Sequence, residues 1–153
     1  MEFKIQFKEA EIDDLNTIVQ LLADDVLGES RERFESPLPS SYTNAFDSIN
    51  KDSNNILLLA QLNDEIIGVL QLTFIPNLTY QGSWRAMIEG VRVSTNFRSK
   101  GIGQSLIQEA IRRAKVKGCR LVQLTTDKQR PDAIKFYEKL GFTSSHEGMK
   151  LHC

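Results

Sequence analysis

A short glycine-containing segment in the second half of the chain has the residue types that bind an anion. Gly101 and Gly103 stand at the start of an amphipathic run, with Arg98 and Lys100 just before them. Apolar residues recur at helical spacing through residues 102–114, which predicts a helix beginning at the glycines. The first N–H groups of such a helix have no partner inside it, and the helix dipole favours a negative group there. The segment therefore predicts a cradle for a pyrophosphate.

The two glycines taken alone would also suit other kinds of loop. A tight strand-to-helix turn needs only the glycines and would bind nothing. A Walker loop needs Gly-Lys-Ser/Thr after a longer gap, and the sequence lacks it. A dinucleotide fingerprint needs three glycines, whereas Gln104, Ser105 and Leu106 supply no third. A nucleotide-binding protein using the same anion site is kept as an alternative, although no Walker lysine or acidic magnesium motif accompanies it.

Two motifs together resemble the GNAT superfamily of acyltransferases. The sequence Arg-x-x-Gly-x-Gly at residues 98–103, after a Val-Arg-Val strand, resembles the acetyl-coenzyme A loop of that superfamily. The sequence Phe-Tyr-x-x-x-Gly-Phe at residues 136–142 resembles its next signature, on a helix. The two occur in the expected order with one strand between them, and the resemblance extends more weakly over nearly the whole chain. Residues 125–127 depart from the pattern, because Thr-Thr-Asp stands where many members carry an asparagine.

The resemblance implies an N-acetyltransferase that moves an acetyl group from acetyl-coenzyme A (acetyl-CoA) directly to a primary amine of a small molecule or peptide. It implies that Glu89 acts as the base, often through water, and that Tyr137 donates a hydrogen bond or proton to the cofactor sulfur. It also implies a set of residues whose backbone pairs with the pantetheine chain or holds the pyrophosphate: Val91, Arg92, Val93, Arg98, Ser99, Lys100, Gly101, Ile102, Gly103, Gln104 and Ser105. No metal is expected, since no His, Cys and Asp cluster has ligand spacing.

The two catalytic candidates could also serve only the structure. Glu89 lies in a strand rich in apolar residues, where it could be an exposed side chain or a salt-bridge partner. Tyr137 recurs with Ile134 and Leu140 at about helical spacing, as a core-packing residue would. A non-catalytic module that binds or senses acyl-CoA would need the cradle but neither side chain, so it is the alternative function. Consumption of the thioester in the presence of amines would separate the two.

The hydrophobic pattern predicts the order β-α-α-β-β-β-α-β-α-β-β, which is also the order of the GNAT fold. A strand hairpin beside alternating strands and helices indicates an α/β (α+β) fold with a mixed, mostly antiparallel sheet. The resemblance adds that the fourth and fifth strands splay apart around the acyl-pantetheine.

Residues 27–41 are expected to be an irregular loop that could cover the substrate. Expected strands cover residues 3–7, 56–61, 66–74, 87–93, 121–124 and a last hairpin within 142–151; expected helices cover 15–22, 42–49, 102–117 and 131–140. Gly90, inside the fourth strand, predicts a bulge or a close backbone approach.

The bulk properties exclude several classes of protein. The 153 residues fit one domain, expected to span 1–153, and a net charge of -1 gives no field to attract nucleic acid or an anionic membrane. No apolar run approaches transmembrane length, and the N-terminus lacks a signal-peptide core. Cys119 and Cys153 have no metal or redox spacing and are expected to be free thiols of a cytoplasmic protein. A homodimer is compatible with the resemblance, because dimers are common in the superfamily.

Overall fold

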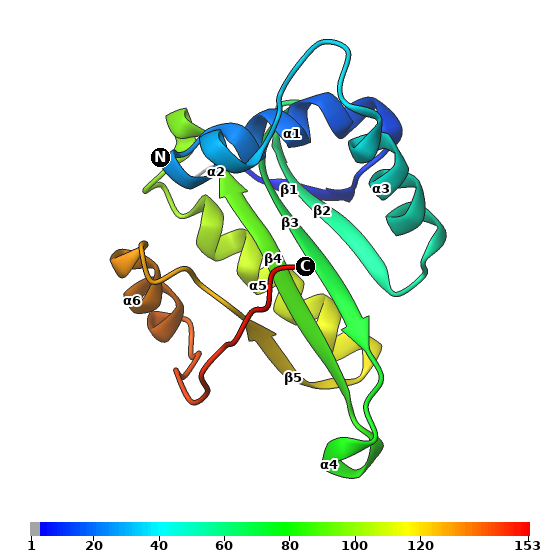
Figure 1. The fold of residues 1–153 in the computed structure, drawn as a ribbon. Coiled ribbons are helices and arrows are strands. Elements are labelled where there is room, and N and C mark those ends of the chain that lie inside the picture. Colours follow the sequence, from blue (N-terminus) through cyan, green and yellow to red (C-terminus); the bar gives the residue numbers. More distant parts are fainter. Residues whose placement is uncertain (1–3) are drawn as a thin grey trace.

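The computed structural model describes residues 4–153, and its centre is a five-stranded mixed sheet whose strands follow chain order (Figure 1). The first four strands are antiparallel to their neighbours, and the last pair is parallel. The strands are β1 (Gln6–Glu9), β2 (Asn55–Leu62), β3 (Glu65–Ile75), β4 (Trp84–Val93) and β5 (Cys119–Leu124). The predicted mixed, mostly antiparallel sheet is therefore confirmed.

Helices cover both faces of this sheet. They are α1 (Leu15–Ala23), α2 (Val26–Arg31), α3 (Ser40–Lys51), the single turn α4 (Thr79–Gly82), α5 (Ile102–Lys117) and α6 (Pro131–Lys139), with 3-10 turns at Ile12–Asp14 and Thr95–Phe97. Along β2, Leu58 and Ala60 face the apolar side of α5, whereas Leu59 packs against α1. This alternation is what a strand buried on both faces requires. None of the helices within residues 4–153 is long and apolar enough to cross a membrane.

A β-bulge interrupts β4 at Gly90. Val69 of β3 lies opposite Arg92, but Gln71 lies opposite Glu89, so one extra residue sits on β4 between the two pairs. Gly90 has φ +63, in the left-handed region that glycine adopts at little cost. Without the bulge, Glu89 and Arg92 would point to opposite faces; with it, both lie on the face of Val69, which α1 covers. The predicted bulge is confirmed, and it decides where Glu89 points.

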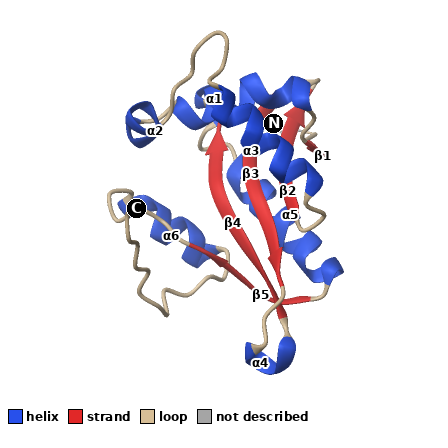
Figure 2. Ribbon diagram, turned by 45° about the vertical axis from the view of Figure 1, so that its right-hand side comes forward, coloured by secondary structure: helices blue, strands red, loops and turns tan. Residues whose placement is uncertain are grey.

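The last two strands separate just beyond the point where β4 bulges. Parallel pairing between β4 and β5 ends at Ile88 and Leu124, and residues 89–93 of β4 have no partner on β5. Figure 2 shows the two strands diverging from their common end near α4, with α6 following β5. The splay expected from the resemblance is therefore present. It leaves one edge of residues 89–93 without a neighbouring strand.

Three sequence-based expectations differ from the structure. The first strand begins at Gln6 rather than residue 3, which lies outside the described residues. The expected irregular loop at residues 27–41 contains part of α2, which the carboxylate of Asp25 caps by accepting from the Gly28 N–H. No strand forms within residues 142–151, so the predicted last hairpin is wrong. That segment is mostly polar, and Met149 and Leu151 stay almost fully exposed, so little apolar surface is buried to stabilise a hairpin.

We predict that Gly90→Ala lowers the free energy of unfolding by about 1–2 kcal/mol, because a Cβ disfavours the left-handed conformation. Space is not the obstacle, since the new Cβ would meet Leu22 Cδ2 at an ordinary 3.7 Å. Chemical denaturation measures the change. Gly148→Ala is the matched control, because its Cβ would meet only Thr125 at 3.8 Å and no left-handed φ is involved. Equal stabilities for the two variants would contradict a strained position at Gly90.

Candidate functional site

The N-terminus of α5 is an uncapped helix end. Gly101, its N-cap residue, has φ +82, and no side chain accepts a hydrogen bond from the first turn. The first hydrogen bond of the helix runs from the Ser105 N–H to the Gly101 carbonyl at 3.1 Å. The N–H groups of Ile102, Gly103 and Gln104 precede it and so point past the helix end without an intrahelical acceptor. A sixteen-residue helix with such an end favours an anion there.

Gly103 places this helix end at the mouth of the splay. A Cβ on Gly103 would lie 3.5 Å from Phe136 of α6 and 3.7 Å from Val93 of β4. The three elements therefore meet around a residue that has no side chain of its own. The arrangement lets a ligand follow the backbone from the α5 terminus toward the gap between β4 and β5.

The basic side chains of the cradle hold the loop itself. Arg98 donates from Nε to the Val93 carbonyl at 3.1 Å and from Nη2 to the Asp24 carbonyl at 2.7 Å. Lys100 Nζ lies 5.7 Å from the centre of the Phe97 ring. Ser99 adopts φ +61, which turns the chain tightly before Gly101. Arg98 thus has a clear structural role in fixing the loop to β4 and to the end of α1.

The strand residues expected to contact a cofactor divide between the two sheet faces. Val91 and Val93 are half-buried against the core under α5. Arg92 lies on the opposite face, and its Nη1 donates to the Val91 carbonyl at 2.9 Å. An extended ligand beside this edge would therefore find that carbonyl already engaged.

Glu89 and Tyr137 lie in different surroundings. Glu89 is exposed and opposes Gln71 on the sheet face that carries Arg92. Tyr137 is half-buried between the rings of Phe136 and Phe142, at centroid distances of 5.1 and 5.8 Å. No hydrogen bond to its hydroxyl occurs within the described part of the chain. Tyr137 contributes to core packing, as its spacing predicts, while leaving its phenol oxygen available to a ligand.

Two positive charges act on the Tyr137 phenol. Burial raises the pKa of Tyr137, while Arg130 and Arg92 oppose that shift by favouring the phenolate. The net shift is upward, so the phenol stays protonated at neutral pH and can donate.

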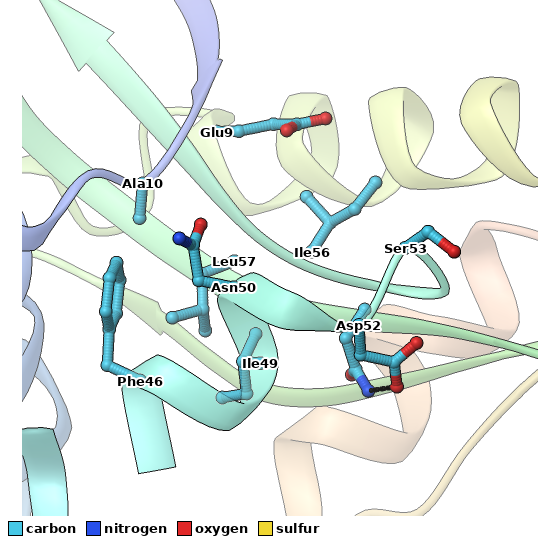
Figure 3. Close-up of a pocket in the computed structure, with 10 residues that line it drawn as sticks. Glu9, Ala10, Phe46, Ile49, Asn50, Asp52, Ser53, Ile56 and Leu57 are labelled. Carbon is cyan, nitrogen blue, oxygen red and sulfur yellow. Dashed lines mark hydrogen bonds between the residues drawn. The ribbon is translucent and has the colours of Figure 1, made fainter. Parts of the chain in front are cut away.

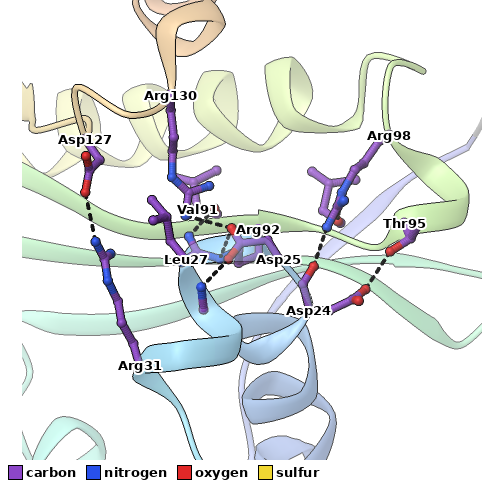
Figure 4. A network of polar contacts seen from close by, with 12 residues as sticks. Asp24, Asp25, Leu27, Arg31, Val91, Arg92, Thr95, Arg98, Asp127 and Arg130 are labelled. Carbon is purple, nitrogen blue, oxygen red and sulfur yellow. Dashed lines mark hydrogen bonds and ion pairs between the residues drawn. The ribbon is translucent and has the colours of Figure 1, made fainter.

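A polar network that sequence reasoning missed connects the α1–α2 segment to the splayed strands (Figure 4). Asp25 accepts from the Gly28 N–H, and its Oδ2 lies 2.7 Å from Arg130 Nη2 and 3.4 Å from Arg92 Nε. Arg31 of α2 pairs with Asp127 at 2.8 Å. Burial would raise the pKa of Asp25, but the Gly28 N–H, Arg130 and Arg92 together lower it. The paired residues are 67 to 105 positions apart in sequence, so no local pattern marks them.

Asp24 extends the same network toward the cradle. Its carboxylate accepts from the Thr95 hydroxyl at 2.6 Å, and its carbonyl accepts from Arg98. The C-terminal end of α1 is therefore tied to both the start of the anion cradle and the Arg92–Arg130 pair. The network therefore links the α1–α2 segment to β4, to the turn after β4 and to the residue before α6.

A separate hollow lies between α3 and the β1–β2 end of the sheet (Figure 3). Phe46, Ile49 and Leu57 line its floor, and Glu9 and Asp52 stand at its edge. None of the predicted site residues borders it. The Glu9 carboxylate pairs with Arg113, and Asp52 accepts from the Asn54 N–H and the Asn55 side chain, so both act in the structure itself.

We predict that Asp25→Asn lowers the free energy of unfolding by about 1–3 kcal/mol, because it leaves two partly buried guanidiniums without their shared charge. An ionised Asp25 stabilises the fold above the pKa of an unfolded aspartate, about 3.9, and this contribution is lost as pH falls through the lower folded value. The stability difference from wild type should therefore be constant near neutral pH and shrink below about pH 4. Denaturation across that range measures the difference.

Asp47→Asn is the control, because Asp47 forms an exposed pair with Lys51, and it should change stability by less than about 0.5 kcal/mol. An equal effect of both variants would contradict the role of Asp25.

Comparison with known proteins identifies the family. Residues 22–142 match the model of the acetyltransferase (GNAT) family. The chain is 33% identical over 91 residues to glucosamine 6-phosphate N-acetyltransferase of Trypanosoma brucei brucei and 32% identical over 95 residues to aminoalkylphosphonate N-acetyltransferase of Salmonella typhimurium, covering 60% and 62% of this chain. It spans about three fifths of the length of these relatives, 60% and 61%. The crystal structure of a protein described as a transcriptional regulator from Bacillus halodurans C-125 superposes with a TM-score of 0.95 at 59% identity, covering 97% of this chain and 99% of that one. The match over residues 22–142, together with the cradle and the splay, shows that this chain belongs to the GNAT acetyltransferase family.

Proposed function

We propose that the protein transfers an acetyl group directly from acetyl-CoA to a primary amine of a small molecule or peptide. The observation that carries the proposal is the uncapped N-terminus of α5 at the mouth of the β4–β5 splay. A pyrophosphate at that end would direct an attached chain along β4, toward Glu89 and Tyr137. Family membership supports this use of the cradle over binding of a free nucleotide.

The residues of the cradle fit acetyl-CoA through main-chain groups. The N–H groups of residues 98–104 would hold the pyrophosphate, since that of Ser105 already donates to the Gly101 carbonyl. The N–H groups of Val91 and Val93, on the stretch of β4 that has no partner on β5, would lie beside the pantetheine carbonyls, because Arg92 already engages the Val91 carbonyl. Bound there, acetyl-CoA supplies an electrophilic thioester. Arg98 would mainly support the loop from behind, since its Nε and Nη2 already donate to backbone carbonyls and only its remaining N–H groups could reach a phosphate.

Glu89 and Tyr137 supply proton-transfer groups from different elements. An alkyl amine is mostly protonated at neutral pH and cannot attack until it loses a proton. The exposed carboxylate of Glu89 would attract the ammonium and take that proton, directly or through water. The protonated phenol of Tyr137 would donate to the sulfur as it leaves. The bulge at Gly90 supports this division by turning Glu89 toward the face that α1 borders.

The curated relatives support a small molecule as the acceptor. Their names specify glucosamine 6-phosphate and aminoalkylphosphonates, and both are small amines. We extend only that class to this chain. A single domain spanning 1–153, a cytoplasmic location and a homodimer stay predictions.

A second candidate is a non-catalytic module that binds or senses acyl-CoA. The description of the Bacillus halodurans protein as a transcriptional regulator favours its consideration. Such a module would bind acetyl-CoA without releasing thiol in the presence of any amine. The exposed carboxylate of Glu89 and the half-buried phenol of Tyr137 favour catalysis, because sensing needs neither.

Release of thiol from acetyl-CoA in the presence of pooled amines tests the transferase proposal. The Tyr137→Phe variant then tests whether Tyr137 is the acid. We predict that this variant lowers kcat by about 10²- to 10⁴-fold, as loss of a positioned acid does, with little change in acetyl-CoA affinity by calorimetry. Tyr80→Phe, at an exposed phenol of α4, is the control. Unchanged kcat, with chemistry shown to limit the rate, would reassign Tyr137 to packing.

We predict that Glu89→Gln lowers kcat/KM for a strongly basic amine, most of all at low pH, where the least amine is already neutral. A weakly basic aromatic amine should show a smaller defect, because it needs less help to lose a proton. Profiles of kcat/KM against pH for both amines measure the difference. Glu65→Gln, at another exposed strand carboxylate, is the control. Wild-type rates at every pH for the Glu89 variant would remove Glu89 from the mechanism.

A further inference from the structure

Three arginines from separate elements gather on the α1–α2 side of the splay (Figure 4). Arg31 belongs to α2, Arg92 to β4, and Arg130 immediately precedes α6. Arg92 and Arg130 both approach the same oxygen of Asp25, at 3.4 and 2.7 Å, while Arg31 pairs with Asp127. Two guanidiniums therefore share one carboxylate at the centre of the group.

Because Arg92 and Arg130 share the single charge of Asp25, one positive charge of this partly buried group is not compensated. The side chains of Arg92 and Asp25 are only 15% and 13% exposed, and that of Arg130 is 33% exposed. Arg92 Nε and Asp25 Oδ2 are both buried, and neither has a hydrogen-bond partner among residues 4–153, so the two groups are held as an ion pair. Glu32, the other carboxylate that acts on Arg92, is half-buried and already accepts from the Tyr42 hydroxyl at 2.8 Å. Burying an excess charge is costly, and a bound anion would remove that cost.

Arg92 and Arg130 lie where the acceptor amine would bind rather than at the anion cradle of α5. Arg92 shares its sheet face with Glu89, three positions earlier on β4, which is at most roughly 10 Å along a strand. The α5 terminus is reached from Val93, which packs on the other face. An amine at Glu89 would thus have its remaining atoms beside Arg92 and Arg130.

We propose that the acceptor is a small amine that also carries an oxyanion, a phosphoryl group or a carboxylate, and that Arg92 and Arg130 bind this group. The inference rests on the proposed acetyl transfer. A guanidinium offers five donors in a planar fork suited to both oxyanions. Arg130 uses one nitrogen on Asp25 and so retains donors for a ligand. Asp25 would hold the two guanidiniums side by side until the anion arrives.

The test compares three amines of similar length: 3-aminopropylphosphonate, 4-aminobutyrate and the uncharged 3-amino-1-propanol. For the wild-type protein, kcat/KM should be about 10- to 100-fold higher for an anionic amine than for the uncharged one, as expected for a charged hydrogen-bonded group. The order of the two anions identifies which oxyanion fits better. Equal kcat/KM for all three amines would overturn the proposal and leave the transferase itself intact.

Arg130→Gln isolates the guanidinium. The ratio of kcat/KM for the anionic amine to that for the uncharged amine should fall at least 10-fold, mainly through KM, and Arg130→Lys should restore part of it. Arg112→Gln, at an exposed guanidinium paired with Glu109 on α5, is the matched control and should keep the wild-type ratio. Thermal melting establishes that each variant is folded. An unchanged ratio in Arg130→Gln together with weaker acetyl-CoA binding would assign the arginine to the cofactor and refute the proposal.

Calorimetry with propylphosphonate, which has no amine, separates this proposal from the transferase. If the wild-type protein binds propylphosphonate and the Arg130→Gln variant does not, the anion site is supported even if no amine is acetylated. Absence of propylphosphonate binding to the wild-type protein, with or without CoA, would overturn it whatever the activity.

Discussion

The bulge at Gly90 is the constraint on which the rest of the site depends. One extra residue on β4 changes which face each following side chain occupies, so Glu89 and Arg92 share a face while Val91 and Val93 stay in the core under α5. Pairing with β5 ends immediately before the bulge, at Ile88. The left-handed residue thus sets the orientation of the Glu89 carboxylate relative to Arg92, at the same point where β4 loses β5 as its neighbour.

A second constraint comes from outside the sheet. Asp24 and Asp25, between α1 and α2, bind groups on β4, on the turn after it and before α6. These contacts tie the α1–α2 segment to the loop that carries Arg130. This network borders the acceptor side of the proposed site. The charges of its residues therefore bear on the kind of molecule that can bind there. The Asp25 carboxylate lies between Arg92 and Arg130 and holds them in place. In the proposed site it neutralises one of the two guanidinium charges and leaves the other for the anion.

Much of the fold was predictable because it follows local rules. The α5 helix and its glycine start, the β2–β3 hairpin and the bulge each depend on residues close in sequence, and the structure confirms them. The short α2 helix was not predicted, since Gly28 weakens a helical pattern and the stabilising cap from Asp25 is visible only in three dimensions. The last hairpin, predicted from the pattern of residues 142–151, does not form because that segment is mostly polar and its Met149 and Leu151 stay exposed. The Asp25–Arg92–Arg130 group joins segments far apart in the chain, and a sequence pattern has no means of bringing them together.

The placement of acetyl-CoA is the central claim, and the backbone amides report it most directly. Titration of ¹⁵N-labelled protein with acetyl-CoA should shift the amide resonances of residues 98–105 and of Val91 and Val93 most strongly, because their N–H groups lie where the pyrophosphate and pantetheine are placed. Amides around Phe46 and Leu57, in the hollow beside α3, should change little. Saturating binding that shifts the α3 hollow and leaves residues 98–105 unchanged would contradict this placement.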